Sequence, residues 1–103
     1  MFINLTPHEI NETITKRKIP SSGVARVEGA SVQVATVDGV PIYRSTFENT
    51  IEGLPEPVPG IIYIVSALAL NAVPKHRTDV VAPGNTMRDK RGKAIGCQGF
   101  RCV

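Results

Sequence analysis

The predicted fold is decided by residues 60–99, which read GIIYIVSALALNAVPKHRTDVVAPGNTMRDKRGKAIGCQG. The stretch opens with Ile61–Val65, a run of apolar residues without polar alternation, which is the pattern of a strand buried on both faces. Ser66 follows as a helix N-cap, and the helix formers after it predict a short helix over 67–73 that Pro74 ends. A strand that leads into a helix start, with several arginines behind it, is typical of a place that holds an anion.

Outside this stretch the chain predicts short strands separated by turns. Asp38-Gly39 lies between SVQVATV and VPIYRST and gives the strongest hairpin signal, because both turn residues tolerate positive φ. Pro41 has no N–H to donate to a ladder, which places the returning strand at a sheet edge. Gly29 is expected to separate two strands. The predicted strands cover residues 2–6, 9–19 (an exposed strand), 24–28, 31–37, 61–65 and 79–83.

Two more segments complete the predicted domain. Residues 53–60, GLPEPVPG, predict a stiff extended loop packed over the sheet, because prolines and glycines alternate through it. Residues 87–88 and 93–97 flank a turn and predict a second hairpin. With about six to eight short strands, residues 1–103 are expected to form a single domain. Its predicted class is mainly β (β-rich α+β), a small antiparallel or mixed sheet, barrel-like, with one short helix.

The basic charge is concentrated in the second half of the chain. Residues 1–59 hold five Lys and Arg against seven Asp and Glu, a balance of −2, whereas residues 60–103 hold seven against two, a balance of +5. The sum is the net charge of +3. This asymmetry favours an anionic partner or, as the alternative, a solvated face. Because so small a domain buries a modest share of its surface, a homo-oligomer is expected.

The cysteines and the apolar runs predict a cytoplasmic setting. Cys97 and Cys102 point to opposite faces of an extended segment, so they are not expected to pair. No charged region followed by a long apolar run starts the chain, so no secretory signal is predicted. The run 61–70 is far shorter than the roughly 20 residues of a membrane span. Reduced thiols in the cytoplasm, with no membrane partner, are therefore expected.

Candidate ligand-binding residues are polar side chains near predicted strand ends. Ser66 offers a hydroxyl beside free N–H groups, or is a plain N-cap. Arg77 suits phosphate or carboxylate, and Asp79 either holds it for a ligand or forms a structural pair with it. Arg88 and Asp89 repeat this pairing in the second hairpin. The candidate ligand-binding residues are Thr6, His8, Ser66, Arg77, Asp79 and Arg88.

Several catalytic and binding classes are disfavoured. His8 either hydrogen-bonds a ligand, acts as acid or base near neutral pH, or is a turn residue satisfied by backbone. Ser66 lacks the flanking glycines of a nucleophile elbow, and no phosphate-binding glycine loop is present. His8 and His76 lack zinc-ligand spacing. Basic residues are not interleaved with aromatics, so nucleic acid is not expected as a partner. No catalytic residue, metal or cofactor is predicted.

The motifs LTPH, GLPEP, GIIYIVS, RTDVV and RDKRGKAIGC follow one another over nearly the whole chain. In these motifs the chain resembles a family of small, largely uncharacterised phage, prophage and bacterial proteins. The resemblance implies the setting of a phage accessory protein in the host cytoplasm. Phage accessory proteins of this size include sponges that remove host immune nucleotide signals.

The expected function is to bind and sequester an anionic, nucleotide-derived immune signal without turnover. Arg77 and Arg88 would contact phosphate, Ser66 would complete the anion site, and His8 would hydrogen-bond the ligand. Two alternatives stay open. One is a small hydrolase or lyase that acts on such a nucleotide with His8 as acid or base. The other is a protein-binding inhibitor of a host factor that uses the sheet edge near Pro41 or the proline-rich loop.

Overall fold

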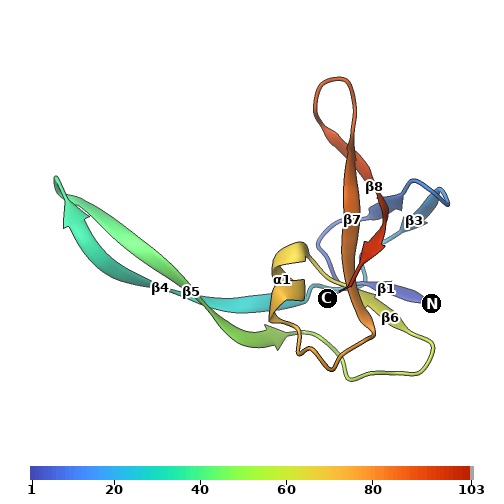
Figure 1. The fold of residues 1–103 in the computed structure, drawn as a ribbon, viewed down its shortest axis with the longest axis horizontal. Coiled ribbons are helices and arrows are strands. Elements are labelled where there is room, and N and C mark those ends of the chain that lie inside the picture. The colour runs from blue at the N-terminus through green and yellow to red at the C-terminus, as the bar shows by residue number, and fades with distance from the viewer. Residues whose placement is uncertain (103) are drawn as a thin grey trace.

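The computed structural model describes the backbone of residues 1–102 and their side chains except those of 28–30 and 45–50. It is strand-rich, with one short helix (Figure 1). The elements are β1 (Phe2–Asn4), β2 (Ile10–Glu12), β3 (Arg17–Ile19), β4 (Arg26–Val37), β5 (Val40–Glu52), β6 (Ile62–Ile64), α1 (Ala67–Ala72), β7 (Val80–Arg88) and β8 (Ala94–Arg101). The predicted fold class, mainly β with one short helix, is confirmed.

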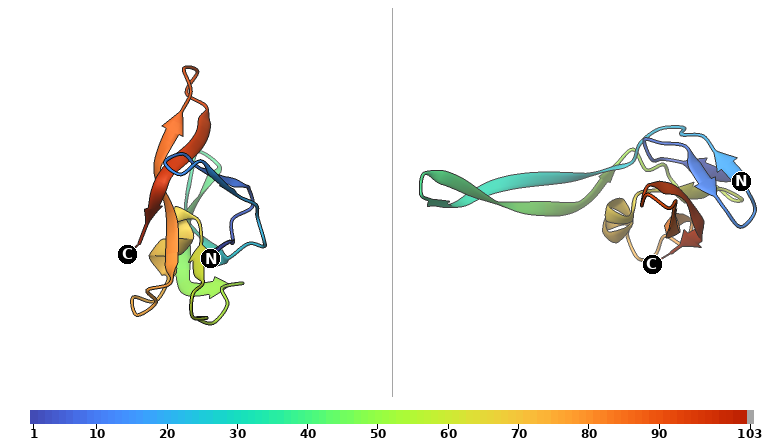
Figure 2. Two further views of the ribbon diagram at one scale, coloured as in Figure 1. Left: turned by 90° about the vertical axis from the view of Figure 1, so that its right-hand side faces the viewer. Right: turned by 90° about the horizontal axis from the view of Figure 1, so that it is seen from above.

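Six strands form one mixed sheet that curls until its two end strands approach each other. The strand order is β1-β6-β7-β8-β2-β3, with β1, β6 and β7 parallel and β7 antiparallel to β8. Just beyond β3, Ser21 bridges Asn4 of β1, and the N–H of Ser22 donates to the Asn4 carbonyl at 2.8 Å. The sheet is therefore nearly closed and barrel-like, as two further views show (Figure 2).

Strand β6 lies at the centre of the core. Tyr63 and Val65 pack in a large cluster with α1, whereas Ile64 points to a second cluster with Ile10 and Cys97. Tyr63, Ile64 and Val65 are at most 2% exposed. The lack of polar alternation in this strand correctly predicted burial on both faces.

The helix begins and ends where the sequence predicts. The Ser66 hydroxyl oxygen accepts a hydrogen bond from the Ala69 N–H at 3.2 Å, which makes Ser66 the N-cap. Val73 is the C-cap, and Pro74 follows it. Ala69 and Leu70 are buried, so the helix covers one side of β6.

The single exposed strand predicted over residues 9–19 is wrong. The segment folds back as the β2–β3 hairpin, in which Ile10 pairs with Ile19 and both are buried. The Glu12 carboxylate accepts two backbone N–H groups of the turn at 2.8–2.9 Å, and Lys16 adopts a positive φ of 57°. A side-chain cap therefore makes the turn, without the glycine or proline that usually marks one.

The predicted break at Gly29 is also wrong, because β4 runs through it without interruption. Gly29 pairs with Phe47, and a register shift beside it absorbs the irregularity. Its partner β5 extends to Glu52. The proline-rich loop starts only at Gly53.

Strands β4 and β5 form a long two-stranded arm that projects from the body (Figures 1 and 2). Asp38 and Gly39 form its turn with φ of 50° and 78°, as the hairpin signal predicted. Pro41 lies opposite Thr36 in a ribbon of two edge strands. The arm makes the molecule elongated, with a radius of gyration of 16.5 Å against about 13 Å for a compact chain of this length.

Candidate functional site: a polar cavity beside β7 and β8

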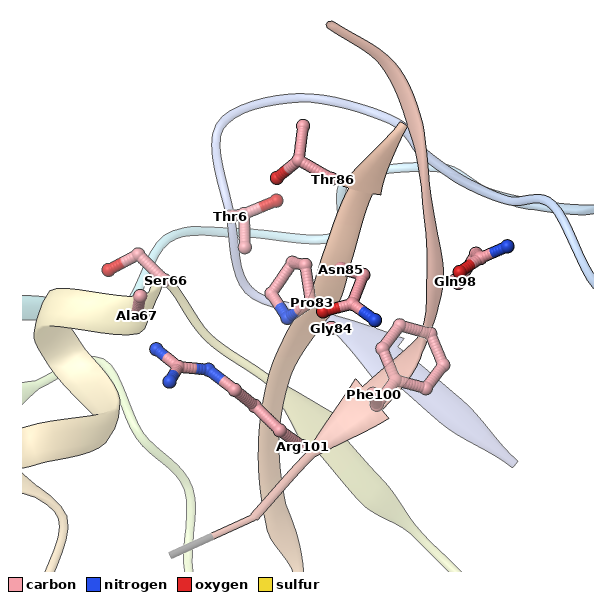
Figure 3. A pocket seen from close by; sticks show the side chains of 10 residues that line it. All are labelled: Thr6, Ser66, Ala67, Pro83, Gly84, Asn85, Thr86, Gln98, Phe100 and Arg101. Carbon is pink, nitrogen blue, oxygen red and sulfur yellow. The ribbon is translucent and has the colours of Figure 1, made fainter. Parts of the chain in front are cut away.

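A cavity of about 700 Å³ lies between the start of α1 and the β7–β8 ribbon (Figure 3). This volume is within the range of small-molecule sites. Residues that carry hydroxyl, amide and guanidinium groups line the cavity from four parts of the chain. The polar lining side chains are Thr6, Ser66, Asn85, Thr86, Gln98 and Arg101.

Arg101 is the charged residue of this lining. Its side chain extends from the end of β8 across the cavity toward Ser66 and Ala67 (Figure 3). Arg101 is exposed, and within the described part of the chain no hydrogen bond or ion pair involves its guanidinium. A guanidinium in this position can present two parallel N–H donors to a phosphate or carboxylate.

Gly84 of β7 lines the cavity and lies close against the backbone of β8. A Cβ at this position would overlap the carbonyl oxygens of Gln98 and Gly99. Any larger residue would therefore push the two strands apart and change the shape of the site.

Two of the predicted site residues, Thr6 and Ser66, line this cavity. The Ser66 hydroxyl oxygen accepts from the Ala69 N–H, which leaves its proton for a ligand acceptor. Thr6 is 8% exposed, and its hydroxyl donates to Oδ1 of Asn4 at 2.6 Å. Ser66 is therefore both a cap and a lining donor, whereas the Thr6 hydroxyl belongs to an internal network.

Asn4, which the sequence did not mark as important, is the centre of that network. The residue is 0% exposed, and its Nδ2 donates to the carbonyls of His8 at 2.8 Å and Ile19 at 3.0 Å. Its Oδ1 accepts the Thr6 N–H at 2.9 Å. The side chain thus joins β1 to the end of β3 and holds the segment beside the cavity.

His8 is exposed and lines a neighbouring cavity of about 360 Å³. Pro83 and Thr86 line both cavities, so His8 adjoins the main site. Its carbonyl accepts hydrogen bonds from the side chains of Asn4 and Thr6, which hold the bend at residues 6–8.

Arg77 and Asp79 form a bidentate pair outside the cavity. Arg77 Nε lies 2.8 Å from Asp79 Oδ1, and Arg77 Nη2 lies 2.9 Å from Asp79 Oδ2. Nη2 also donates to the Pro55 carbonyl at 3.0 Å. The hydrogen bonds from Arg77 lower the pKa of Asp79, and the same hydrogen bonds raise the pKa of Arg77. The pair fastens the proline-rich loop to the segment before β7.

Arg88 lies at the far end of the β7–β8 hairpin. Its Nη1 donates to the Gly92 carbonyl at 2.9 Å, while the Asp89 carboxylate accepts the N–H groups of Arg91 and Lys93. The second Arg–Asp pair suggested by the sequence is therefore not formed. Arg77, Asp79 and Arg88 do not line the cavity that Thr6 and Ser66 share.

Glu12 is a buried carboxylate that the sequence did not mark as important. Hydrogen bonds from the Thr15 hydroxyl and from the backbone N–H of Gly99, the latter at 3.0 Å, are the main causes that lower its pKa to about 2. The carboxylate thus stays ionised at neutral pH and ties the β2–β3 turn to β8.

Two negative observations apply to the described residues. Within residues 1–102, no three His, Cys, Asp or Glu side chains are placed to hold a metal ion. The helix in this part of the chain is too short to span a membrane. Comparison of the chain with protein-family models, curated proteins and solved structures found no match.

Proposed function

We propose that this protein binds and sequesters a small anionic ligand, a nucleotide-derived immune signal, in the cavity beside β7 and β8. One observation carries the proposal. The Arg101 guanidinium lies at the cavity, on the side of Ser66, without a hydrogen-bonding partner in the described chain. A phosphate there would take up these donors and neutralise the charge.

The lining supplies complementary groups for the other parts of a nucleotide. The Ser66 hydroxyl lies on the side of the cavity toward which Arg101 extends, so the two can donate to one phosphate group. Asn85 and Gln98 also line the cavity and carry amides, which both donate and accept. Figure 3 shows the Gln98 amide on the side of β8 away from the Arg101 guanidinium, so it would contact a part of the ligand remote from the phosphate. Phe100 is also a lining residue, and its ring packs on Phe2 with the ring centroids 5.1 Å apart.

Sequestration requires that the ligand stays intact. The polar lining groups are an arginine, hydroxyls and amides, which hydrogen-bond a ligand but do not exchange protons near neutral pH. This composition favours holding over cleavage. The role of a phage accessory protein in the host cytoplasm agrees with the family that the sequence resembles.

A hydrolase or lyase is the second candidate, and it is favoured by the position of His8. The His8 cavity and the main cavity share Pro83 and Thr86. A ligand long enough to span both would bring its reacting bond beside an imidazole, the side chain that most often serves as a general acid or base.

Isothermal titration against a panel of cyclic oligonucleotides and ADP-ribose derivatives tests the proposal. We expect saturable binding of at least one compound, and its recovery unchanged after the complex is denatured. A chemically altered product would select the hydrolase or lyase. The absence of binding across the panel would contradict both candidates.

A further inference from the structure

The turn of the β7–β8 hairpin carries the whole positive excess of the chain. Residues 88–93, RDKRGK, hold four Lys and Arg against one Asp, a balance of +3. The remaining residues hold eight Lys and Arg against eight Asp and Glu, a balance of zero. The net charge of the chain therefore belongs to residues 88–93, which we name the basic tip.

Hydrogen bonds from and to Asp89 fix the conformation of the basic tip. Asp89 Oδ1 accepts the N–H of Arg91 at 2.8 Å and that of Lys93 at 3.0 Å. The Gly92 N–H donates to the Asp89 carbonyl at 3.0 Å, and Gly92 has a φ of 81°, as is common after a type I turn in a hairpin. Lys90 and Arg91 thus occupy the two central positions of the turn, and the acidic side chain of the tip is bound to its backbone.

No acidic side chain of the described chain pairs with a cation of the basic tip. Residues 88–95 are all exposed. The ion pair found among the described side chains joins Arg77 to Asp79 and lies outside the tip. Glu9 lines a cavity with Ala94 at the base of the tip, but it forms no ion pair there. The positive charge of the tip therefore faces solvent and is available to an anionic partner.

The basic tip stands at the free end of a two-stranded ribbon. The β7–β8 hairpin projects from the body, apart from the β4–β5 arm (Figures 1 and 2). Beyond the pair of Met87 with Gly96, the ribbon extends by roughly 10 Å at the rise of a strand. The major groove of B-form DNA is about 12 Å wide and about 8.5 Å deep, and it admits a two-stranded β-ribbon. The free part of the hairpin therefore matches this groove in width and in depth.

The composition of the basic tip favours a duplex over other anionic partners. Residues 88–93 contain no apolar or aromatic side chain. A protein–protein interface has an apolar core with aromatic anchors, an interfacial membrane anchor inserts apolar residues, and a single-strand platform stacks bases on aromatic rings. A protein–DNA interface is instead polar and strongly basic, and much of its affinity comes from Lys and Arg contacts to phosphate.

We infer that the basic tip binds the phosphate backbone of double-stranded DNA, with the end of the ribbon in the major groove. Contacts to phosphate carry no sequence information, so this binding is independent of sequence. The lack of aromatics among the basic residues disfavours a single-strand platform, but a duplex does not require stacking. The tip does not line the cavity of Arg101, so the two sites can be tested separately. The phosphate contacts come from Arg88, Lys90, Arg91 and Lys93.

Fluorescence anisotropy of a labelled duplex of mixed sequence tests this inference, with the full chain titrated at salt concentrations between about 50 and 200 mM. We expect saturable binding with a Kd on the order of 10⁻⁵ M at the lowest salt. The logarithm of the association constant should fall with the logarithm of the salt concentration with a slope of about −3 to −4, since each phosphate contact contributes about −0.9. The absence of binding at the lowest salt, or a slope shallower than about −2, would overturn the inference.

Two pairs of substitutions locate the binding surface. Lys90→Gln with Arg91→Gln should make the slope shallower by about 2 and weaken binding at the lowest salt by about 10- to 100-fold. Both side chains are exposed, and Asp89 holds the backbone of the turn, so the variant should keep the circular dichroism spectrum of the wild type. Lys18→Gln with Lys75→Gln removes the same charge from exposed positions outside the tip and should leave the slope nearly unchanged. Equal effects of the two pairs would overturn the inference.

Two further probes compare the duplex with other anionic partners. The single strand of the same sequence should bind more weakly than the duplex, because its charge density is lower and the tip offers no ring for stacking. Phosphatidylcholine vesicles that contain about 30% phosphatidylserine should also bind more weakly, because the tip has no apolar residue to enter the lipid. Tighter binding of either probe than of the duplex would contradict the placement of the ribbon in a DNA groove.

Discussion

Replacement of Asn4 by alanine should strongly weaken the closure of the sheet. The substitution removes the side-chain hydrogen bonds to the carbonyls of His8 and Ile19 and to the N–H of Thr6. Asn4 is 0% exposed, so these groups lose their partner in a buried site. Each unsatisfied buried group costs about 1–3 kcal/mol, and partial entry of water reduces the sum to on the order of 3–5 kcal/mol.

Urea denaturation followed by circular dichroism measures this effect, and Asn11→Ala is the matched control. Asn11 donates one exposed hydrogen bond to the Ile95 carbonyl at 3.0 Å. Its loss should cost at most about 1 kcal/mol. In thermal melts, Asn4→Ala should lower the midpoint by more than about 12 °C, since each kcal/mol corresponds to several degrees for a chain of this size.

The reasoning is refuted if the two alanine variants lose the same free energy of unfolding within about 0.5 kcal/mol. That result would mean that the backbone contacts around Ser21 and Ser22 close the sheet without the Asn4 side chain.

Three further predictions concern stability and the cavity wall. The pKa of Glu12 is about 2 in the folded state against an ordinary 4.5, so its contribution to stability is present above pH of about 4.5 and lost toward pH 2. Glu12→Gln should therefore reduce the loss of unfolding free energy on acidification. The loss that remains is expected from Asp79, whose pKa is also lowered. A stability–pH curve identical to that of the wild type would contradict this prediction. Arg77→Ala should lower the free energy of unfolding by about 1–3 kcal/mol and speed proteolysis of the loop over residues 53–60. A proteolysis rate equal to that of the wild type would refute the role of Arg77 in holding this loop. Gly84→Ala should cost about 1–3 kcal/mol by forcing β7 from β8, and a wild-type melting curve would contradict the close approach.

The sequence predicted the elements whose signals are local. The apolar run of β6, the cap Ser66 and the stop Pro74 act on neighbouring residues, so their effects are readable without the fold. Asp38-Gly39 likewise determines its own turn. The predicted short strands and the single short helix together indicated the β-rich class, which the structure confirms.

The errors and omissions depend on partners far apart in the sequence. The β2–β3 turn is made by the carboxylate of Glu12, which also accepts a bond from Gly99, 87 residues away. In the sequence nothing distinguishes Asn4 from other strand residues, because its partner Ile19 comes beside it only in the fold. Gly29 stays in a strand because a facing strand satisfies its backbone.

In the candidate site, too, the sequence predicted the residues with local signals and missed the residue whose position depends on distant partners. Ser66 was found from its local motif, and the Arg77–Asp79 pair was recognised from its spacing, with a structural role as one alternative. Arg101 was counted in the basic half, but no motif distinguished it from the other cations. Only the pairing of β8 with β7, the strand that α1 also contacts, places its guanidinium at a cavity.

The central claim is that Arg101 supplies the charge that holds an anionic ligand. Isothermal titration of the ligand found in the nucleotide panel should compare Arg101→Gln with Arg88→Gln, because Arg88 is exposed and bonded to the Gly92 carbonyl instead. We predict that Arg101→Gln weakens binding by about 10- to 100-fold, the loss of a charge-assisted contact, while Arg88→Gln binds like the wild type. Equal affinities of the two variants would contradict the claim.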